Sequence, residues 1–160
     1  MRSQLAKAVR TRFETGLLQG CPGFECVRRP VAPAGDRIFR WVHPSGRCFF
    51  IALLFHTHED WFTLEAGWSS GEWPATATLD LPSEISEASE ARFRICHLWS
   101  RDGLDHWWQF APRRDINDIL APDPSIHTLL PKADGLIDDA LRRVREHVLP
   151  YFETVRRALE

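Results

Sequence analysis

The apolar run Cys48–Phe55 constrains the fold of this chain more than any other segment. Every position in it is apolar, which is typical of a β-strand covered on both faces. The runs on either side, Arg37–Val42 and residues 60–66, alternate their side chains between two faces, as half-buried strands do. Because short turns such as residues 43–46 join these runs, the segment predicts an antiparallel meander.

Amphipathic helices are predicted near both ends of the chain. In residues 3–19, every fourth position from Leu5 to Leu17 is apolar, which places these side chains on one helical face. A second helix is predicted from Asp134 onward, and its apolar stripe continues beyond Pro150. That proline is expected either to kink the helix or to start a new one.

Further strands are predicted outside the meander. Residues 24–28 precede it as a short strand, and residues 92–99 follow it as a longer one. The pair Asp102-Gly103 is a tight-turn signal, so a hairpin is predicted from residues 92–99 to residues 105–110. With this order of elements, residues 1–160 are predicted to form a single α+β domain. Its antiparallel sheet of about five strands is packed by the N- and C-terminal helices.

Charge and cysteine content disfavour several classes of protein. The formal net charge is -2, and a general nucleic-acid binder needs a clustered cationic surface instead. No apolar run reaches the roughly 18 residues of a membrane span, and no secretory signal is visible. The 4 cysteines therefore favour reduced thiols and a cytoplasmic location. The C-terminal arginines are interpreted as the solvated helix face, and they are Arg142, Arg143, Arg145, Arg156 and Arg157.

The clearest charge asymmetry is the acidic stretch, residues 71–91, which contains no Lys or Arg. Its carboxylates are Glu72, Asp80, Glu84, Glu87 and Glu90. The acidic stretch belongs to a predicted polar connection, residues 67–91, that also contains Trp68 and Trp73. A tryptophan in such a connection either pins it to the domain or anchors a partner protein, and the sequence leaves both interpretations open.

Several patterns suggest enzyme chemistry, and each has a structural explanation. The segment 67–71 (GWSSG) matches the G-x-S-x-G motif of hydrolases around Ser69, but no helix start follows it, so a turn is favoured. Acid–base chemistry would draw on Asp102, Asp105, His106 or His127, for which the sequence supplies no geometry. We therefore predict no catalytic residues and no cofactor, with a small hydrolase as the alternative.

Metal ligands are the second enzyme-related possibility. Cys21 with Cys26, and His56 with His58, are spaced closely enough to share an ion, but a closed zinc site needs four ligands. Cys48 and Cys96 are solitary and are interpreted as core thiols. No metal site is predicted, and a metal-dependent enzyme that uses the histidines stays an alternative.

Two aromatic motifs resemble a bacterial family known as domain of unknown function 4304. The first comprises residues 94–99 (RICHLW) and, after a short polar hairpin, residues 106–110 (HWWQF). The second is the Pro-aromatic-Phe step of residues 149–153 (LPYFE) near the end of the last helix. The resemblance implies no catalytic residues. Domains of this kind are encoded near bacterial toxins, so the resemblance implies an immunity protein by analogy.

The expected function is that of a non-enzymatic protein-binding domain, specifically a bacterial immunity protein that neutralises a cognate protein toxin. Toxins that act on anionic substrates have cationic active sites, which the acidic stretch would complement. Its expected contact residues are Trp68, Trp73, Asp80, Glu84, Glu87 and Glu90. A module that self-associates through its aromatic surface is the remaining alternative, and no nucleic-acid or membrane partner is expected.

Overall fold

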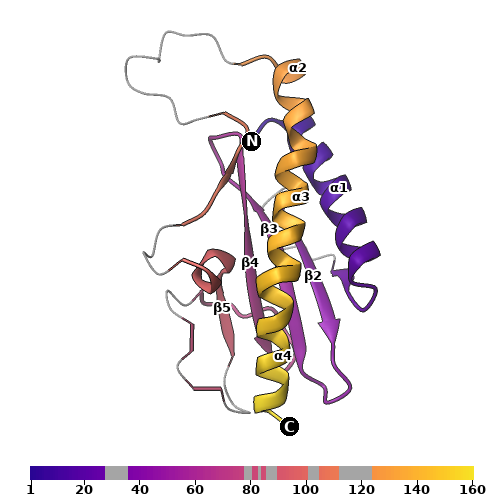
Figure 1. Cartoon of the computed structure of the whole chain (residues 1–160), viewed down its shortest axis with the longest axis vertical. Coiled ribbons are helices and arrows are strands. Elements are labelled where there is room, and N and C mark those ends of the chain that lie inside the picture. The colour runs from indigo at the N-terminus through magenta and orange to yellow at the C-terminus, as the bar shows by residue number, and fades with distance from the viewer. Residues whose placement is uncertain (28–35, 78–80, 83, 86–89, 101–104, 112–123) are drawn as a thin grey trace.

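The centre of the fold is an antiparallel sheet in which the first five strands pair in the order of the sequence (Figure 1). The computed structural model describes residues 1–27, 36–77, 81–82, 84–85, 90–100, 105–111 and 124–160. The order is β1-β2-β3-β4-β5, and a short strand, β6, also pairs with β4. The strands are β1 Glu25–Val27, β2 Arg37–Val42, β3 Cys48–Phe55, β4 Trp61–Ser69, β5 Ala91–Arg94 and β6 Trp108–Gln109.

The predicted meander is confirmed as strands β2, β3 and β4. The longest pairing joins β3 to β4, from Cys48 opposite Ser69 to Phe55 opposite Phe62. The turn between β2 and β3 contains Gly46, whose φ of 85° is a conformation that glycine adopts without steric cost. Six consecutive residues of β3 are buried, because helices cover one face of the sheet and the chain after β4 returns over part of the other.

The predicted hairpin between residues 92–99 and 105–110 is wrong. β5 ends at Arg94, and the chain continues as the 3₁₀-helix η1, Ile95–Leu98. β5 pairs with residues 65–68 of β4, whereas β6 pairs with Trp61 and Phe62 of the same strand. β5 and β6 therefore share one edge of β4 and do not pair with each other. The Asp102-Gly103 turn lies outside the described residues.

The helices lie on one face of the sheet, which confirms the predicted α+β class (Figure 1). They are α1 Ser3–Gly20, α2 Ile126–Leu129, η3 Leu130–Lys132, α3 Ala133–Arg143, η4 Val144–Val148 and α4 Leu149–Ala158. The elements from α2 to α4 follow one another as a single rod. In the described part of the chain, none of the helices has the length and apolar character of a membrane span.

Pro150 is accommodated without ending this rod. The segment before it, η4, is a π-helical turn in which the Leu149 N–H bonds the Val144 carbonyl, and Pro150 lies in the first turn of α4. Phe152 then packs on Phe49 of β3 with ring centroids 5.0 Å apart, and Phe13 of α1 packs on Phe39 of β2 at 5.8 Å. α1 and the rod from α2 to α4 therefore share one core with the sheet.

The two faces of the sheet differ in character. The helix-covered face is apolar, and its buried residues include Phe39, Phe49, Ile51, Leu53, Phe62, Leu64, Ala66, Trp68 and Phe93. The opposite face, called the open face below because no described helix covers it, carries a small apolar cluster of Ile38, Cys48, Phe50 and Ala52. Next to that cluster, β4 contributes the buried polar residues Thr63, Glu65 and Ser69. The buried polar side chains of β4 therefore lie on the open face of the sheet.

Candidate functional site

The chain after β4 folds back onto the open face through Trp73. The Trp73 ring lies edge-on to Phe50 at 5.6 Å, and the Arg92 guanidinium lies 5.1 Å from the same ring. The ring also lies next to Gly67, where a Cβ would be in ordinary contact with it at 3.4 Å. Trp73 is half-buried, so it pins the connection to the sheet, one of the two interpretations that the sequence left open.

The expectation that Trp68 lies in a polar connection is wrong. Trp68 belongs to β4 and is fully buried on the helix-covered face, opposite Phe49 of β3. Its Nε1 lies beside the hydroxyl of Tyr151, and burial raises the pKa of that phenol above its usual value. The connection therefore begins only after Ser69, and a side chain inside the core is not available to a partner. β4 continues its alternation three residues beyond the expected end at Ala66, so Trp68 faces the core while Gly67 and Ser69 face the open side.

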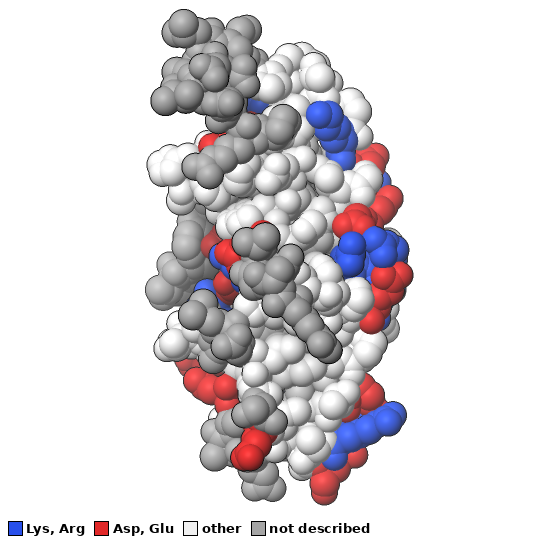
Figure 2. Space-filling model, turned by 60° about the vertical axis from the view of Figure 1, so that its left-hand side comes forward, with Lys and Arg blue, Asp and Glu red and all other residues white. Residues whose placement is uncertain are grey.

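The acidic stretch presents exposed carboxylates beyond Trp73. Glu72, Glu84 and Glu90 are exposed, and neither Glu84 nor Glu90 forms an ion pair with another described residue. Asp80 and Glu87 lie outside the described residues. Figure 2 shows acidic side chains at the lower end of this face without visible cationic neighbours, while red and blue alternate along the right-hand edge. The stretch therefore adds negative charge that the described chain does not compensate.

Most C-terminal arginines, in contrast, are engaged within their own helices. Arg142 pairs with Asp139 and with Glu146, and Arg156 pairs with Glu153 and Glu160. Arg157 also pairs with Glu153. Two guanidinium groups hold the Glu153 carboxylate, chiefly that of Arg156, and they lower its pKa to about 2. These arginines are paired surface groups rather than a cationic patch, in agreement with their interpretation from the sequence.

A buried ion cluster lies on the open face beside Trp73. The Glu65 side chain is 5% exposed, and its Oε2 accepts a hydrogen bond from Arg92 Nε at 2.6 Å. Arg94 Nη1 lies 3.4 Å from Oε1 of the same carboxylate, and the Arg94 guanidinium stacks 5.1 Å from the Trp107 ring. Glu65 thereby joins β4 to β5 across the sheet. Asp105 adds a second carboxylate beside Arg94, whose Nε lies 3.8 Å from Asp105 Oδ1.

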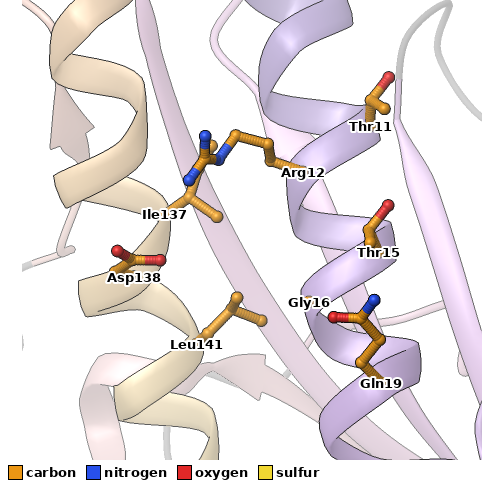
Figure 3. Close-up of a pocket in the computed structure, with 8 residues that line it drawn as sticks. All are labelled: Thr11, Arg12, Thr15, Gly16, Gln19, Ile137, Asp138 and Leu141. Carbon is orange, nitrogen blue, oxygen red and sulfur yellow. The ribbon is translucent and has the colours of Figure 1, made fainter.

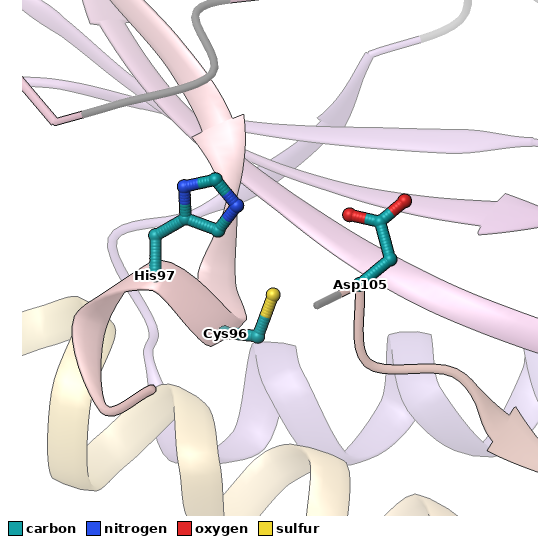
Figure 4. A group of neighbouring side chains, drawn as sticks. All are labelled: Cys96, His97 and Asp105. Carbon is teal, nitrogen blue, oxygen red and sulfur yellow. The ribbon is translucent and has the colours of Figure 1, made fainter. Parts of the chain in front are cut away.

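A second polar group forms where β5 turns into η1. The side chains of Cys96, His97 and Asp105 converge, with one ligand atom from each lying within 4.8 Å of the others (Figure 4). Cys96 is buried, His97 is half-buried and Asp105 is exposed. Burial raises the pKa of the Cys96 thiol, while the backbone N–H of His106 hydrogen-bonds its sulfur and acts in the opposite direction.

The interpretation of Cys96 as a solitary core thiol was therefore incomplete. The sequence did contain a signal, because the adjacent pair Cys96-His97 places two metal-ligating side chains together. β5 ends at Arg94, so Cys96 and His97 lie in η1 rather than in the expected strand over residues 92–99, and Asp105 converges on them there.

The residues of the hydrolase alternative have structural roles. Ser69 is 2% exposed; its hydroxyl donates to the Glu72 carbonyl and accepts from the Gly71 N–H at 3.2 Å, so it closes a turn. Asp102 lies outside the described residues. Of the other acid–base candidates, Asp105 lies beside Cys96, His106 packs at 4.6 Å from Trp108, and His127 lies in α2. Burial lowers the pKa of His106.

The structure also places the two candidate metal-ligand pairs, His56 with His58 and Cys21 with Cys26. His56 and His58 follow β3 in a turn, not on one strand face, and their rings lie 6.3 Å apart. His56 Nδ1 accepts the backbone N–H groups of His58 and Glu59 at 3.2 and 3.0 Å. Cys21 is buried beyond the end of α1. Within the described ranges, neither pair gains a third His, Cys, Asp or Glu ligand.

A groove of about 320 Å³ lies between α1 and α3 on the helical side of the molecule (Figure 3). Gly16 and Leu141 form its floor; a Cβ on Gly16 would lie only 2.4 Å from Leu141 Cδ1. Thr11, Thr15 and Gln19 line the rim with Asp138 and Arg12, and Arg12 pairs with Asp134 at 2.6 Å. The groove is open and uncharged at its base, so it offers a ligand little beyond shape.

No family model, curated protein or solved structure matches this chain. The resemblance to domain of unknown function 4304 therefore stays a prediction that two aromatic motifs carry. In the structure, Trp108 of the first motif stacks on Phe62 at 5.3 Å. Tyr151 of the second motif packs edge-on against Phe93 at 5.3 Å. The first motif therefore contributes a core contact within the sheet, and the second joins β5 to α4.

Proposed function

We propose that this chain is a protein-binding domain without catalytic activity, and specifically an immunity protein that neutralises a cognate toxin. One observation carries the proposal: Glu84 and Glu90 are exposed and unpaired among the described residues, on a connection that Trp73 pins to the sheet. Most cations of the C-terminal helix are compensated locally, so they do not offset these carboxylates.

The proposed contact surface differs from the one expected from the sequence. Trp68 is removed from it because its side chain is in the core, and Trp73 acts mainly by holding the connection. The carboxylates would face the cationic active site of a toxin that acts on an anionic substrate. Complementary charge accelerates encounter and disfavours wrong partners, so the acidic stretch would set the association rate and its salt dependence.

The experiment uses the immobilised protein to capture partners from the lysate of its source bacterium. One stoichiometric protein, retained at low salt and released at high salt, is purified and assayed for toxic activity with and without this chain. Stoichiometric loss of that activity on adding the chain is the expected result. A partner whose activity is unchanged by the chain would refute the immunity function.

A charge-reversed pair of variants locates the surface. Glu84→Lys with Glu90→Lys is expected to slow association about tenfold or more and to flatten its salt dependence, within the 10–10³-fold range of electrostatic steering. Glu14→Lys with Asp138→Lys is the matched control, since it makes the same charge change on α1 and α3. Equal effects of the two pairs would show that net charge matters and that the acidic stretch is not the contact surface.

A further inference from the structure

We propose that Cys96, His97 and Asp105 bind one Zn²⁺ ion. The proposal is independent of toxin binding, because these residues lie at the junction of β5 and η1 and not on the acidic stretch. Zinc is the metal that a mixed set of thiolate, imidazole and carboxylate suits best, since softer metals prefer sulfur alone and harder ones prefer oxygen.

The geometry needs only small side-chain movements to close around an ion. Zinc lies about 2.0–2.3 Å from N, O and S ligands, so ligand atoms in a tetrahedral site are about 3.3–3.8 Å apart. The three ligand atoms here already lie within 4.8 Å of one another, so they must approach by about 1 Å. His97 is half-buried and Asp105 is exposed, so both can rotate toward the buried sulfur (Figure 4).

The η1 turn holds Cys96 in place and buries its side chain, so the sulfur has a fixed position at the junction of β5 and η1. Cys48 is the contrasting thiol: it is equally buried, but its sulfur donates to the Gly46 carbonyl at 3.9 Å and joins no group of ligands among the described residues. Burial by itself therefore does not bring ligands together in this fold.

The Asp105 carboxylate favours a bound cation at this site, whereas the neighbouring Arg94 guanidinium opposes it. Arg94 Nε lies 3.8 Å from Asp105 Oδ1, which is too far for a hydrogen bond. The Asp105 oxygens therefore stay available to a metal ion. The Arg94 charge is itself partly balanced by Glu65. Three protein ligands leave a fourth tetrahedral position for water, as in open zinc sites.

The test is a titration of the reduced, metal-free protein with Co²⁺ in the absence of oxygen, followed by displacement with Zn²⁺. Co²⁺ bound to a thiolate has a near-ultraviolet charge-transfer band, which reports sulfur ligation directly. We expect the band to saturate at one equivalent and Zn²⁺ to abolish it, because Zn²⁺ binds such sites more tightly than Co²⁺. A wild-type protein that shows no band would overturn the proposal.

Four variants assign the ligands. Cys96→Ser is expected to lose the band, whereas Cys48→Ser is the matched control and keeps it at unchanged affinity. His97→Ala and Asp105→Asn are each expected to keep the band but to weaken Co²⁺ binding at least about tenfold. Because the side chains of His97 and Asp105 are not buried, these two variants remain informative if Cys96→Ser fails to fold. Unchanged Co²⁺ affinity in both would refute the site.

Discussion

Replacing Gly67 by alanine tests how β4, β5 and the acidic stretch are joined. An ideal Cβ on Gly67 would lie 2.6 Å from the backbone oxygen of Ala91, below the 3.0 Å that Cβ atoms keep in real structures. Relieving the contact therefore needs a shift of at least 0.4 Å, the difference between these two distances. The obstacle is backbone in a paired strand, so a side-chain rotation cannot remove it.

The magnitude follows from two opposing effects. Forcing a methyl group into a packed site costs about 1–3 kcal/mol, while Gly→Ala restricts the unfolded chain and returns about 0.4–1 kcal/mol. Taking midpoints, we expect Gly67→Ala to lower the free energy of unfolding by about 1.3 kcal/mol. For a domain of this size, that corresponds to a Tm lower by about 3–5 °C.

Gly71→Ala is the matched control, because a Cβ there meets nothing within 4 Å. The unfolded-state effect is common to both variants, so their difference in urea denaturation isolates the steric cost of about 1–3 kcal/mol. Adding Trp73→Ala should not rescue Gly67→Ala, since the ring would lie at an ordinary 3.4 Å from the new Cβ. Equal stability of the two alanine variants would refute the close approach of β5 to Gly67.

Three further predictions concern charged groups. Glu65→Gln removes the carboxylate that pairs with Arg92 and Arg94. Both arginines are over 20% exposed and keep other contacts, so urea denaturation should show a loss of less than about 3 kcal/mol, and no loss would contradict the cluster. Burial raises the pKa of Asp36 above its unfolded value, so the ionised carboxylate destabilises the folded state at neutral pH. Asp36→Asn should therefore raise the free energy of unfolding at neutral pH by less than about 1 kcal/mol. This gain should vanish in acid, where Asp36 is protonated in both the folded and the unfolded state. A gain that persists at low pH would exclude this cause. Glu153 should titrate near its pKa of about 2 by NMR, and Arg156→Gln should move that pKa toward the usual value; an unchanged pKa would assign the effect to Arg157.

The sequence predicted those elements whose pattern is complete within a short segment. Arg37–Val42 and Cys48–Phe55 have the expected bounds, and the N-terminal helix ends one residue later than predicted. Apolar periodicity is a local property, so it identifies a strand or a helix without knowledge of its neighbours. The hairpin after residue 99 failed for the opposite reason, because a turn signal does not specify which strand the chain pairs with next.

The candidate sites depended more on the tertiary structure. Composition located the acidic stretch, since charge content needs no geometry, and the exposed Glu84 and Glu90 lie within it. The roles of two tryptophans five residues apart could not be separated from the sequence. The alternation of β4 directs Trp68 into the core, whereas Trp73 lies beyond the end of β4 and reaches the open face because the chain folds back onto Phe50.

The sequence by itself determined the α+β class, the meander and the charge asymmetry, because hydrophobic periodicity and composition are properties of consecutive residues. Only the tertiary structure decided that β5 and β6 share one edge of β4 and that Glu65 holds two arginines. It also decided that Cys96, His97 and Asp105 converge. Such arrangements join residues from separate segments, and the free energy that selects them comes from burying both faces of the sheet at once.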